Sequence, residues 1–213
     1  MFREEIILPI VRGKNVLDCG GIDHSFIEKK RVDGAWLHDK ICREAATCLG
    51  VDILKDRVDQ VNATGNYHFV EANVEELNFE SQFDVVVAGE LIEHVYNSGK
   101  FLDSVWRSLK PDGRLVITTP NSYALSFWFH AMLSGKENCH EEHTCYYSKQ
   151  TLTYIVERHG FDIEQFYILR RPARSGLRNL MRSIAHAVRP ALGEQLVLVA
   201  RKKPSQSKYD DKW

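Results

Sequence analysis

Short apolar runs that predict strands alternate with amphipathic stretches that predict helices along most of this 213-residue chain. The run at residues 83–88 (FDVVVA) is apolar and β-branched almost throughout, as expected of a central strand that is buried on both faces. Alternation of this kind is typical of a parallel sheet with helices on both sides. The chain is therefore predicted to be an α/β protein with a doubly wound, mostly parallel sheet.

Seven strands are expected, and helices connect most of them. The strands lie at residues 15–20, 49–53, 67–72, 83–88, 114–119, 161–169 and 195–200. Helices are expected at residues 36–49, 55–64, 99–109 and 148–159, and a glycine ends the second and the fourth. The sequence Lys-Pro-Asp-Gly at 110–113 predicts a turn before the fifth strand.

Two segments interrupt this alternation. Residues 121–147 are rich in aromatic side chains and are predicted to form an insertion that covers an acceptor. Residues 170–190 carry six arginines beside an apolar stripe, which predicts a basic amphipathic helix. That stripe is either buried against the domain or in contact with an anionic membrane surface. The chain is expected to be one domain over residues 1–203 with a flexible tail at 204–213.

Composition limits the partners and the compartment. The 28 Lys and Arg residues balance 29 Asp and Glu residues, so no nucleic-acid partner is expected. The five cysteines are odd in number and scattered, which favours a reducing, cytoplasmic setting over a disulfide framework. The amino-terminal residues lack the order of a secretory signal, and the most apolar stretch is too short for a membrane span.

Polar residues and glycines follow the predicted strands at one edge of the sheet, where ligands bind in open parallel sheets. The first strand ends in D-x-G-G, and glycine lets the backbone approach a ligand closely. An acidic residue at the end of the second strand suits the hydroxyls of a ribose. Each residue alone is also compatible with a turn or a helix cap, but together they predict a nucleoside site. The set is Asp18, Gly20, Gly21, Asp52, Asn73, Gly89 and Glu90.

The order of these elements and five motifs resemble the class I S-adenosylmethionine-dependent methyltransferases. The motifs are VLDCGG at 16–21, GVD at 50–52, EANVEEL at 71–77, FDVVVAGELIEHV at 83–95 and LKPDGRLVITTPN at 109–121. The resemblance covers residues 14–169 and the final strand, and the last two motifs are the most specific. It implies a Rossmann-like methyltransferase fold that uses S-adenosylmethionine and releases S-adenosylhomocysteine.

The resemblance also implies a role for each strand-end residue. Gly20 and Gly21, next to Asp18 in the same turn, would face the methionine part of the cofactor. Asp52 would face the ribose, and Asn73 and Val74 would face the adenine. Gly89 and Glu90 would lie near the sulfonium. The chain departs from the family's D-x-G-x-G-x-G loop, because Ile22 and His24 occupy the second and third glycine positions. Asp18 and Asp52 are also 34 residues apart, against about 20 in typical nucleotide-binding units.

Two histidines are candidate catalytic bases. His94 follows Glu90 by four residues, and a neutral imidazole can accept the proton of a hydroxyl group near pH 7. His143, or less favourably His140, lies in the segment after the fifth strand, where acceptors approach. Each histidine is equally compatible with a structural role. The spacing Glu90-x-x-Glu93-His94 would suit a divalent cation. The Cys and His residues at 139–145 are too close in sequence for a typical zinc site. On balance, no metal is expected.

The function predicted from these features is methyl transfer to an oxygen, or less favourably a nitrogen, of a small or lipid-linked acceptor. Carbohydrate is the first choice, because the segment at 142–161 is similar to family members of surface-polysaccharide or secondary-metabolite synthesis. One alternative is a vestigial module that binds the cofactor without catalysis, which the altered glycine loop favours. The other is a dinucleotide-dependent oxidoreductase, which the lack of G-x-G-x-x-G disfavours.

Overall fold

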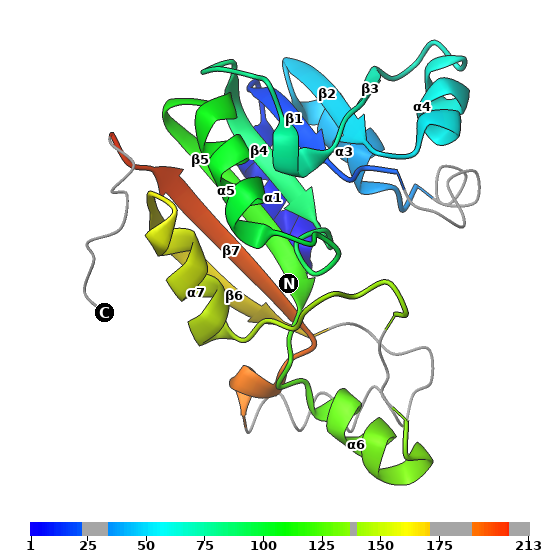
Figure 1. Cartoon of the computed structure of the whole chain (residues 1–213), viewed down its shortest axis with the longest axis vertical. Coiled ribbons are helices and arrows are strands. Elements are labelled where there is room, and N and C mark those ends of the chain that lie inside the picture. Colours follow the sequence, from blue (N-terminus) through cyan, green and yellow to red (C-terminus); the bar gives the residue numbers. More distant parts are fainter. Residues whose placement is uncertain (23–33, 137–139, 171–188, 205–213) are drawn as a thin grey trace.

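The computed structural model describes residues 1–22, 34–136, 140–170 and 189–204 (Figure 1). The predicted basic helix at 170–190 therefore lies almost entirely outside the described residues, as do His24 and nearly all of the predicted tail at 204–213.

One seven-stranded sheet organises the fold, in the order β3-β2-β1-β4-β5-β7-β6. Strands β1 to β5 pair in parallel, whereas β7 is antiparallel to both β5 and β6. This arrangement confirms the predicted α/β class with a mostly parallel sheet. The strands are β1 (Asn15–Cys19), β2 (Thr47–Asp52), β3 (Phe69–Glu71), β4 (Phe83–Gly89), β5 (Leu109–Pro120), β6 (Phe161–Leu169) and β7 (Gln195–Lys202).

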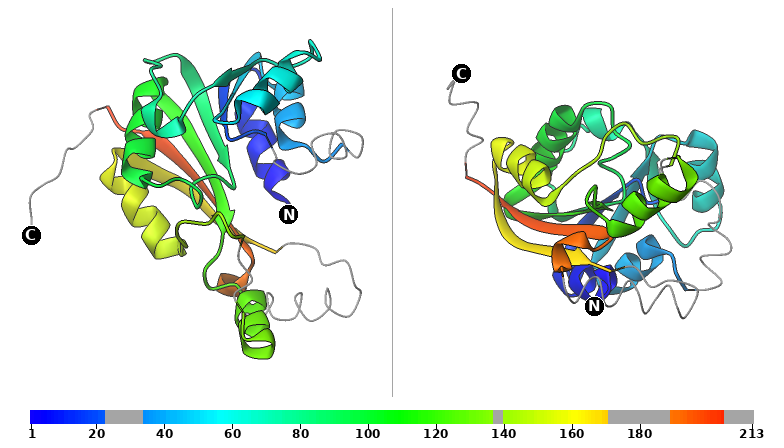
Figure 2. Two further views of the ribbon diagram at one scale, coloured as in Figure 1. Left: turned by 45° about the vertical axis from the view of Figure 1, so that its right-hand side comes forward. Right: turned by 90° about the horizontal axis from the view of Figure 1, so that it is seen from below.

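Helices cover both faces of the sheet (Figure 2). The α-helices are α1 (Arg3–Val11), α3 (Leu37–Glu44), α4 (Lys55–Asn62), α5 (Ser98–Ser108), α6 (Leu125–Ser134) and α7 (Lys149–Arg158), with short 3₁₀ turns η1 (Val74–Glu76) and η2 (Pro190–Leu192). None of the helices in the described ranges combines the length and the apolar character that crossing a bilayer would need.

The alternation of side chains along β4 divides the core into two layers. Val86 and Ala88 lie in the layer that includes apolar residues of α5 and α7, whereas Val85 and Val87 lie in the layer that includes residues of α1 and α3. The four side chains are at most 2% exposed. The unbroken apolar run of β4 therefore reflects burial on both faces, as predicted.

The helix expected at 36–49 was predicted too long. The helix α3 ends at Glu44, and Ala45 already has an extended backbone with ψ 154°. Thr47 and Cys48 belong instead to β2, where they pair with Asn15 and Val16. Sheet pairing with β1 therefore outweighs the helical periodicity of this segment, which local sequence cannot reveal.

Three further differences concern the edges of elements. The helix α1 was not predicted, yet its Ile7 and Val11 are fully buried against the sheet. Strand β3 is shorter than the predicted 67–72. The predicted turn at 110–113 is a bulge inside β5, because Phe83 pairs with Leu109 and Val85 already pairs with Arg114. Asp112 adopts a φ of +58° within that bulge.

The helix α6 projects beyond the carboxyl end of β5 (Figure 1). It has no buried side chain in the part of the chain that the structure describes. Trp128 and Phe129 are 58% and 50% exposed, and Met132 and Leu133 are exposed further. The apolar character of the segment therefore does not come from packing against the described core.

Candidate functional site

The carboxyl ends of β1, β2, β4 and β5 meet at one edge of the sheet, because these strands are parallel. The predicted cofactor residues lie at or just after these ends or the end of β3. Asp18 lies in β1, with Gly20 and Gly21 just after it, and Asp52 is the last residue of β2. Asn73 and Val74 follow β3, whereas Gly89 ends β4 and Glu90 follows it.

Close packing explains the two glycines after β1. Gly20 has a φ of +67° and donates its backbone N–H to the carbonyl oxygen of Val51 at 2.8 Å. A Cβ atom on Gly20 would lie 2.7 Å from Leu91 Cδ1, and one on Gly21 would lie 2.7 Å from Asp18 Oδ2. A larger residue would therefore require Leu91 or Asp18 to shift, and the positive φ of Gly20 by itself favours glycine.

The carboxylate of Asp52 joins the loops that follow β1 and β2. Its Oδ2 accepts the backbone N–H of Ile22 at 3.2 Å, and its Oδ1 accepts that of Leu54 at 3.1 Å. The residue is 6% exposed. Because a carboxylate offers about four lone-pair sites, this orientation is compatible with additional hydroxyl donors. Asp52 thus points toward the first loop.

Asp18 forms a buried pair with His38. The Nδ1 atom of His38 lies 2.8 Å from Asp18 Oδ2, and the two side chains are 0% and 3% exposed. The rings of Trp36, Tyr67 and Phe69 surround the imidazole, and the Trp36 indole N–H donates to the Gly21 carbonyl oxygen at 2.7 Å. His38 was not among the predicted site residues. The only signal for it was the Leu-His pair at the start of the helix.

Two cysteines extend this pair toward β2. Cys42 Sγ lies 3.2 Å from His38 Nε2, and Cys48 Sγ lies 3.9 Å from His38 Nδ1. Burial lowers the pKa of His38, but its hydrogen bonds to Asp18 and Cys42 outweigh burial and raise that pKa to about 9. The Cys48 hydrogen bond lowers the pKa of Cys42 to about 6 against the opposing effect of burial, and His38 lowers it further. The same hydrogen bond raises the pKa of Cys48.

Glu90 follows β4 in a strained backbone conformation. Its φ is +55°, a region that residues other than glycine rarely adopt. Its backbone N–H donates to the carbonyl oxygen of Thr118 at 2.8 Å, and its Oε1 accepts from Gln195 Nε2 at 2.8 Å and from Thr118 Oγ1 at 3.1 Å. Contacts from β5 and β7 therefore hold Glu90 in place, and backbone strain of this kind clusters at functional sites.

Three imidazole rings gather beside the end of β4. The ring centroids of His94 and His143 are 4.7 Å apart, and His140 lies 5.9 Å from His94 and 6.0 Å from His143. The structure therefore brings the two predicted catalytic histidines together. His140, the less favoured alternative to His143 in the sequence, also lies in this cluster.

Hydrogen bonds from Thr144 fasten the histidine-bearing segment to the loop after β4. Its backbone N–H and its hydroxyl both donate to the Glu93 carbonyl oxygen, at 2.8 and 3.0 Å, and the hydroxyl also contacts the Val95 carbonyl at 2.8 Å. Glu93 itself is 2% exposed, and its Oε2 accepts from Thr119 Oγ1 at 2.9 Å. The residues at 92–94 form a turn rather than a helix. Glu90 and His94 therefore do not share a helical face.

This site also holds groups that can bind a cation. Ligand atoms of Glu93, His94 and His143 lie within 4.8 Å of one another.

Of the two predicted adenine contacts, Asn73 caps η1 by accepting the Glu75 backbone N–H at 3.0 Å, and Val74 packs in the core at 9% exposure.

Solved structures share the architecture of this chain. An S-adenosylmethionine-dependent methyltransferase of Archaeoglobus fulgidus superposes with a TM-score of 0.64 at 19% identity, covering 94% of this chain and 91% of that one. A second, from Mesorhizobium loti, gives 0.62 at 16% identity and covers 94% and 98%. The chain therefore has the Rossmann-like α/β fold of these S-adenosylmethionine-dependent methyltransferases.

Sequence comparison defines the family. Residues 2–165 match the family model described as a methyltransferase domain, and the chain belongs to this family. The UbiE ubiquinone/menaquinone biosynthesis C-methyltransferase of Vibrio campbellii is 35% identical over 107 residues, which are 49% of this chain and 40% of that protein. The mitochondrial ubiquinone biosynthesis O-methyltransferase of Bos taurus is 28% identical over 187 residues, covering 76% and 49%. The chain thus spans half or less of these curated relatives.

The family implies S-adenosylmethionine as the cofactor, and the strand-end residues fit it in part. The Asp52 carboxylate at the end of β2 is buried, oriented by two backbone amides and directed at the loop after β1. The glycines of that loop leave backbone atoms, rather than side chains, at the turn. Asp18, by contrast, directs Oδ2 to His38.

Proposed function

We propose that this protein transfers a methyl group from S-adenosylmethionine to a hydroxyl oxygen of a small or lipid-linked acceptor. The observation that carries the proposal is the cluster of His94, His140 and His143 beside the carboxyl end of β4. Imidazole is the side chain best suited to accept a hydroxyl proton near neutral pH.

In this proposal, the strand-end residues hold the cofactor as follows. Asp52 receives the ribose hydroxyls, and Asn73 and Val74 flank the adenine. The backbone at Gly20 and Gly21, with Asp18 beneath it, faces the methionine part. Gly89 and Glu90 border the sulfonium. The bound cofactor supplies an activated methyl group, so the protein contributes mainly alignment, which is worth roughly 7–11 kcal/mol in well-oriented reactions.

His94 and His143 act on the acceptor rather than on the cofactor. One imidazole accepts the hydroxyl proton while the acceptor oxygen is aligned with the methyl group. The second ring, 4.7 Å away, positions the first and forms one wall of the acceptor site. The hydrogen bonds of Thr144 to the backbone of Glu93 and Val95 keep this geometry rigid.

The helix α6 is proposed as the part of the acceptor lid that meets a lipid-linked or aromatic acceptor. Its exposed Trp128, Phe129 and Met132 suit an apolar acceptor better than a free sugar. Two acceptor types follow: a lipid-linked carbohydrate, and a hydroxylated quinone precursor, since the UbiE and Bos taurus relatives are named for ubiquinone biosynthesis. A basic contact of residues 170–190 with anionic lipid and a cytoplasmic location complete the proposal.

A second function has a specific observation in its favour. Asp18 of the D-x-G-G turn is bound to His38, and Ile22 follows where the family has a glycine. Both features suit a protein that binds the cofactor without methyl transfer and regulates a partner.

Two measurements on the full chain distinguish these functions. Equilibrium binding of S-adenosylhomocysteine is expected for either function, and its absence would refute both. Transfer from an isotopically labelled methyl donor is then measured on lipid-linked carbohydrates and on polyprenylated phenols. Label in an ether linkage supports the proposal, whereas cofactor binding with no label in either pool supports the regulatory module. Label attached to carbon would contradict the hydroxyl acceptor.

A further inference from the structure

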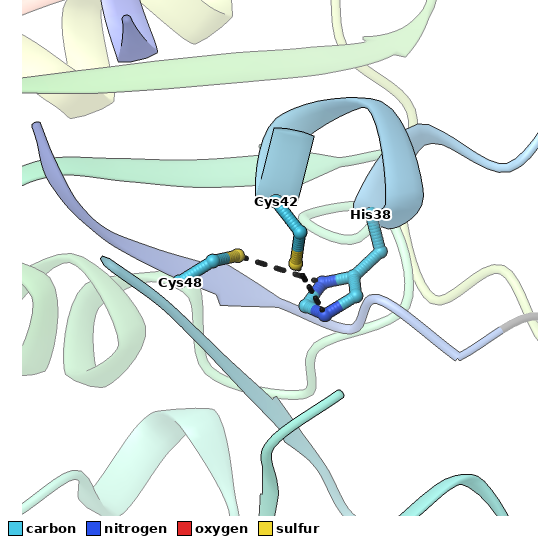
Figure 3. A group of neighbouring side chains, drawn as sticks. All are labelled: His38, Cys42 and Cys48. Atoms are coloured by element: carbon cyan, nitrogen blue, oxygen red, sulfur yellow. Dashed lines mark hydrogen bonds between the residues drawn. The ribbon is translucent and has the colours of Figure 1, made fainter. Parts of the chain in front are cut away.

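His38, Cys42 and Cys48 form a compact donor cluster (Figure 3). His38 and Cys42 lie one turn apart on α3, and Cys48 lies on the neighbouring strand β2. The ligand atoms of the three residues all lie within 4.8 Å of one another. The cluster, hereafter the Cys/His cluster, has no part in the proposed methyl transfer.

We propose that the Cys/His cluster binds one thiophilic cation of the Zn²⁺ or Cu⁺ type through His38 Nε2, Cys42 Sγ and Cys48 Sγ. Two sulfur ligands and one imidazole nitrogen are a donor set that these soft or borderline cations prefer. The 3.2 Å between Cys42 Sγ and His38 Nε2 is close to the separation of two ligands that share one metal ion. Each cysteine loses its thiol proton to solvent when the cation binds.

Asp18 orients the imidazole for this role. Its Oδ2 lies 2.8 Å from His38 Nδ1, and a proton shared there directs the Nε2 lone pair toward Cys42 Sγ, 3.2 Å away, while Cys48 Sγ lies 3.9 Å from Nδ1 of the same ring. Histidines that bind metals usually donate their other N–H group to a carboxylate or carbonyl in this way. The Phe69 and Trp36 rings, with centroids 4.3 and 5.2 Å from the imidazole, add an apolar shell. Asp18 is therefore a positioning residue in this proposal.

A cation can reach the cluster from solvent. Cys42 and Cys48 are only partly buried, and both line an open groove of about 550 Å³ together with Thr47, Asn62 and His68. With three protein ligands, a tetrahedral ion keeps one position toward this groove for water or another donor. Structural zinc sites close that fourth position with protein. The Cys/His cluster is thus predicted to be an exchangeable site.

The donor type separates this site from the group formed by Glu93, His94 and His143. That group offers oxygen and nitrogen atoms only, whereas the Cys/His cluster offers two sulfur atoms. A sulfur-to-metal charge-transfer absorption therefore reports the Cys/His cluster. Because Cys145 lies near His143 in sequence, it supplies the matched control for cysteine substitution.

The test uses the full chain, reduced and free of oxygen, with His94→Ala and His143→Ala introduced to remove the competing donors. Zn²⁺ is titrated in competition with a chromogenic chelator, Cu⁺ in competition with a Cu⁺-specific chelator, and Co²⁺ is added as a spectroscopic probe. We expect one equivalent of Zn²⁺ or Cu⁺ per chain and a sulfur-to-cobalt band. The Cys42→Ser and Cys48→Ser variants should each lose the band and at least tenfold in affinity, and Cys145→Ser should retain both.

The Asp18→Asn variant tests whether Asp18 orients the His38 imidazole for cation binding. It should keep the cobalt band but weaken Zn²⁺ binding by about 10- to 100-fold, as loss of a carboxylate behind a ligating histidine does.

A cobalt band that persists in Cys42→Ser and Cys48→Ser, or a chain that binds none of the three cations, would overturn the proposal. If either serine variant fails to fold, alkylation of the unsubstituted chain decides. Zn²⁺ should protect Cys42 and Cys48 from iodoacetamide, and equal labelling with and without Zn²⁺ would refute the site.

Discussion

The imidazole rings of His94 and His143 meet almost perpendicularly, with centroids 4.7 Å apart and an interplanar angle of 85°. The first follows the central strand β4, and the second lies in the segment between β5 and α7. Hydrogen bonds of Thr144 to the backbone of Glu93 and Val95 hold the two segments together. This contact joins the loop after β4 to the segment proposed to cover the acceptor.

Replacing His94 with alanine should reduce the rate of methyl transfer by about 100-fold or more, the range that general-base catalysis supplies. Affinity for S-adenosylhomocysteine should stay within about twofold, because His94 faces the acceptor in this proposal. Single-turnover kinetics with a hydroxylated acceptor measures the rate, and calorimetry measures the affinity.

His159→Gln is the control for the loss of a histidine. The Nδ1 atom of His159 lies 2.8 Å from Asp103 Oδ1. His159 precedes β6, which is the outermost strand of the sheet next to β7. This variant should leave the rate nearly unchanged. Full turnover by His94→Ala would show that the base lies elsewhere or that none is needed.

Replacing Asp52 with alanine should weaken S-adenosylhomocysteine binding by at least about tenfold, which corresponds to roughly 1.4 kcal/mol. The reason is the loss of the carboxylate that the amides of Ile22 and Leu54 orient at the end of β2. Asp56→Ala removes an exposed carboxylate four residues away and should have no effect on binding. Equal affinities for the two variants in a calorimetric titration would rule out Asp52 as the ribose contact.

Replacing Gly50 with alanine should destabilise the fold by about 1–3 kcal/mol, the usual cost of overpacking. A Cβ atom at this position of β2 would run into the ring of Phe69 on β3. Urea unfolding measures the loss. Phe69→Leu in the same chain should reduce the cost of Gly50→Ala, because the two residues share the space. Additive effects of the two substitutions would argue against this contact.

Asp84 should stabilise the fold in a pH-dependent way. Partial burial raises its pKa, but the Asn15 backbone N–H and the Lys110 ammonium, each 2.9 Å away, outweigh burial and leave the pKa below its ordinary value. Because the folded pKa is the lower one, the stabilisation is present above the unfolded value of about 3.9 and is lost as pH falls through the folded value.

Asp84→Asn should therefore lower the free energy of unfolding at pH 7 by about 1 kcal/mol, an amount reduced by solvent screening of this partly exposed pair. The difference from the unsubstituted chain should shrink as the pH is lowered below about 4. Chemical denaturation at a series of pH values measures it. A difference that stays constant down to pH 3 would exclude the carboxylate as its source.

Local patterns predicted the strands well and the end of α3 poorly. The β-branched run of β4 and the glycines after β1 are local signals, each contained in a few consecutive residues, so the strands and the residues at their ends could be predicted from them. Residues 45–49 continue the helical period of α3 in sequence. They turn into β2 because Thr47 and Cys48 pair with β1, a contact that no local pattern contains.

The sequence by itself determined the α/β class, the strand-end residues and the two histidines that were candidates for a base, because periodicity and residue type act over a few neighbouring positions. Only the tertiary structure decided that His94 meets His143, that Asp18 pairs with His38, and that Cys42 and Cys48 converge on that same imidazole. These contacts join residues distant along the chain, and their geometry is set by how strands and helices pack rather than by any one segment.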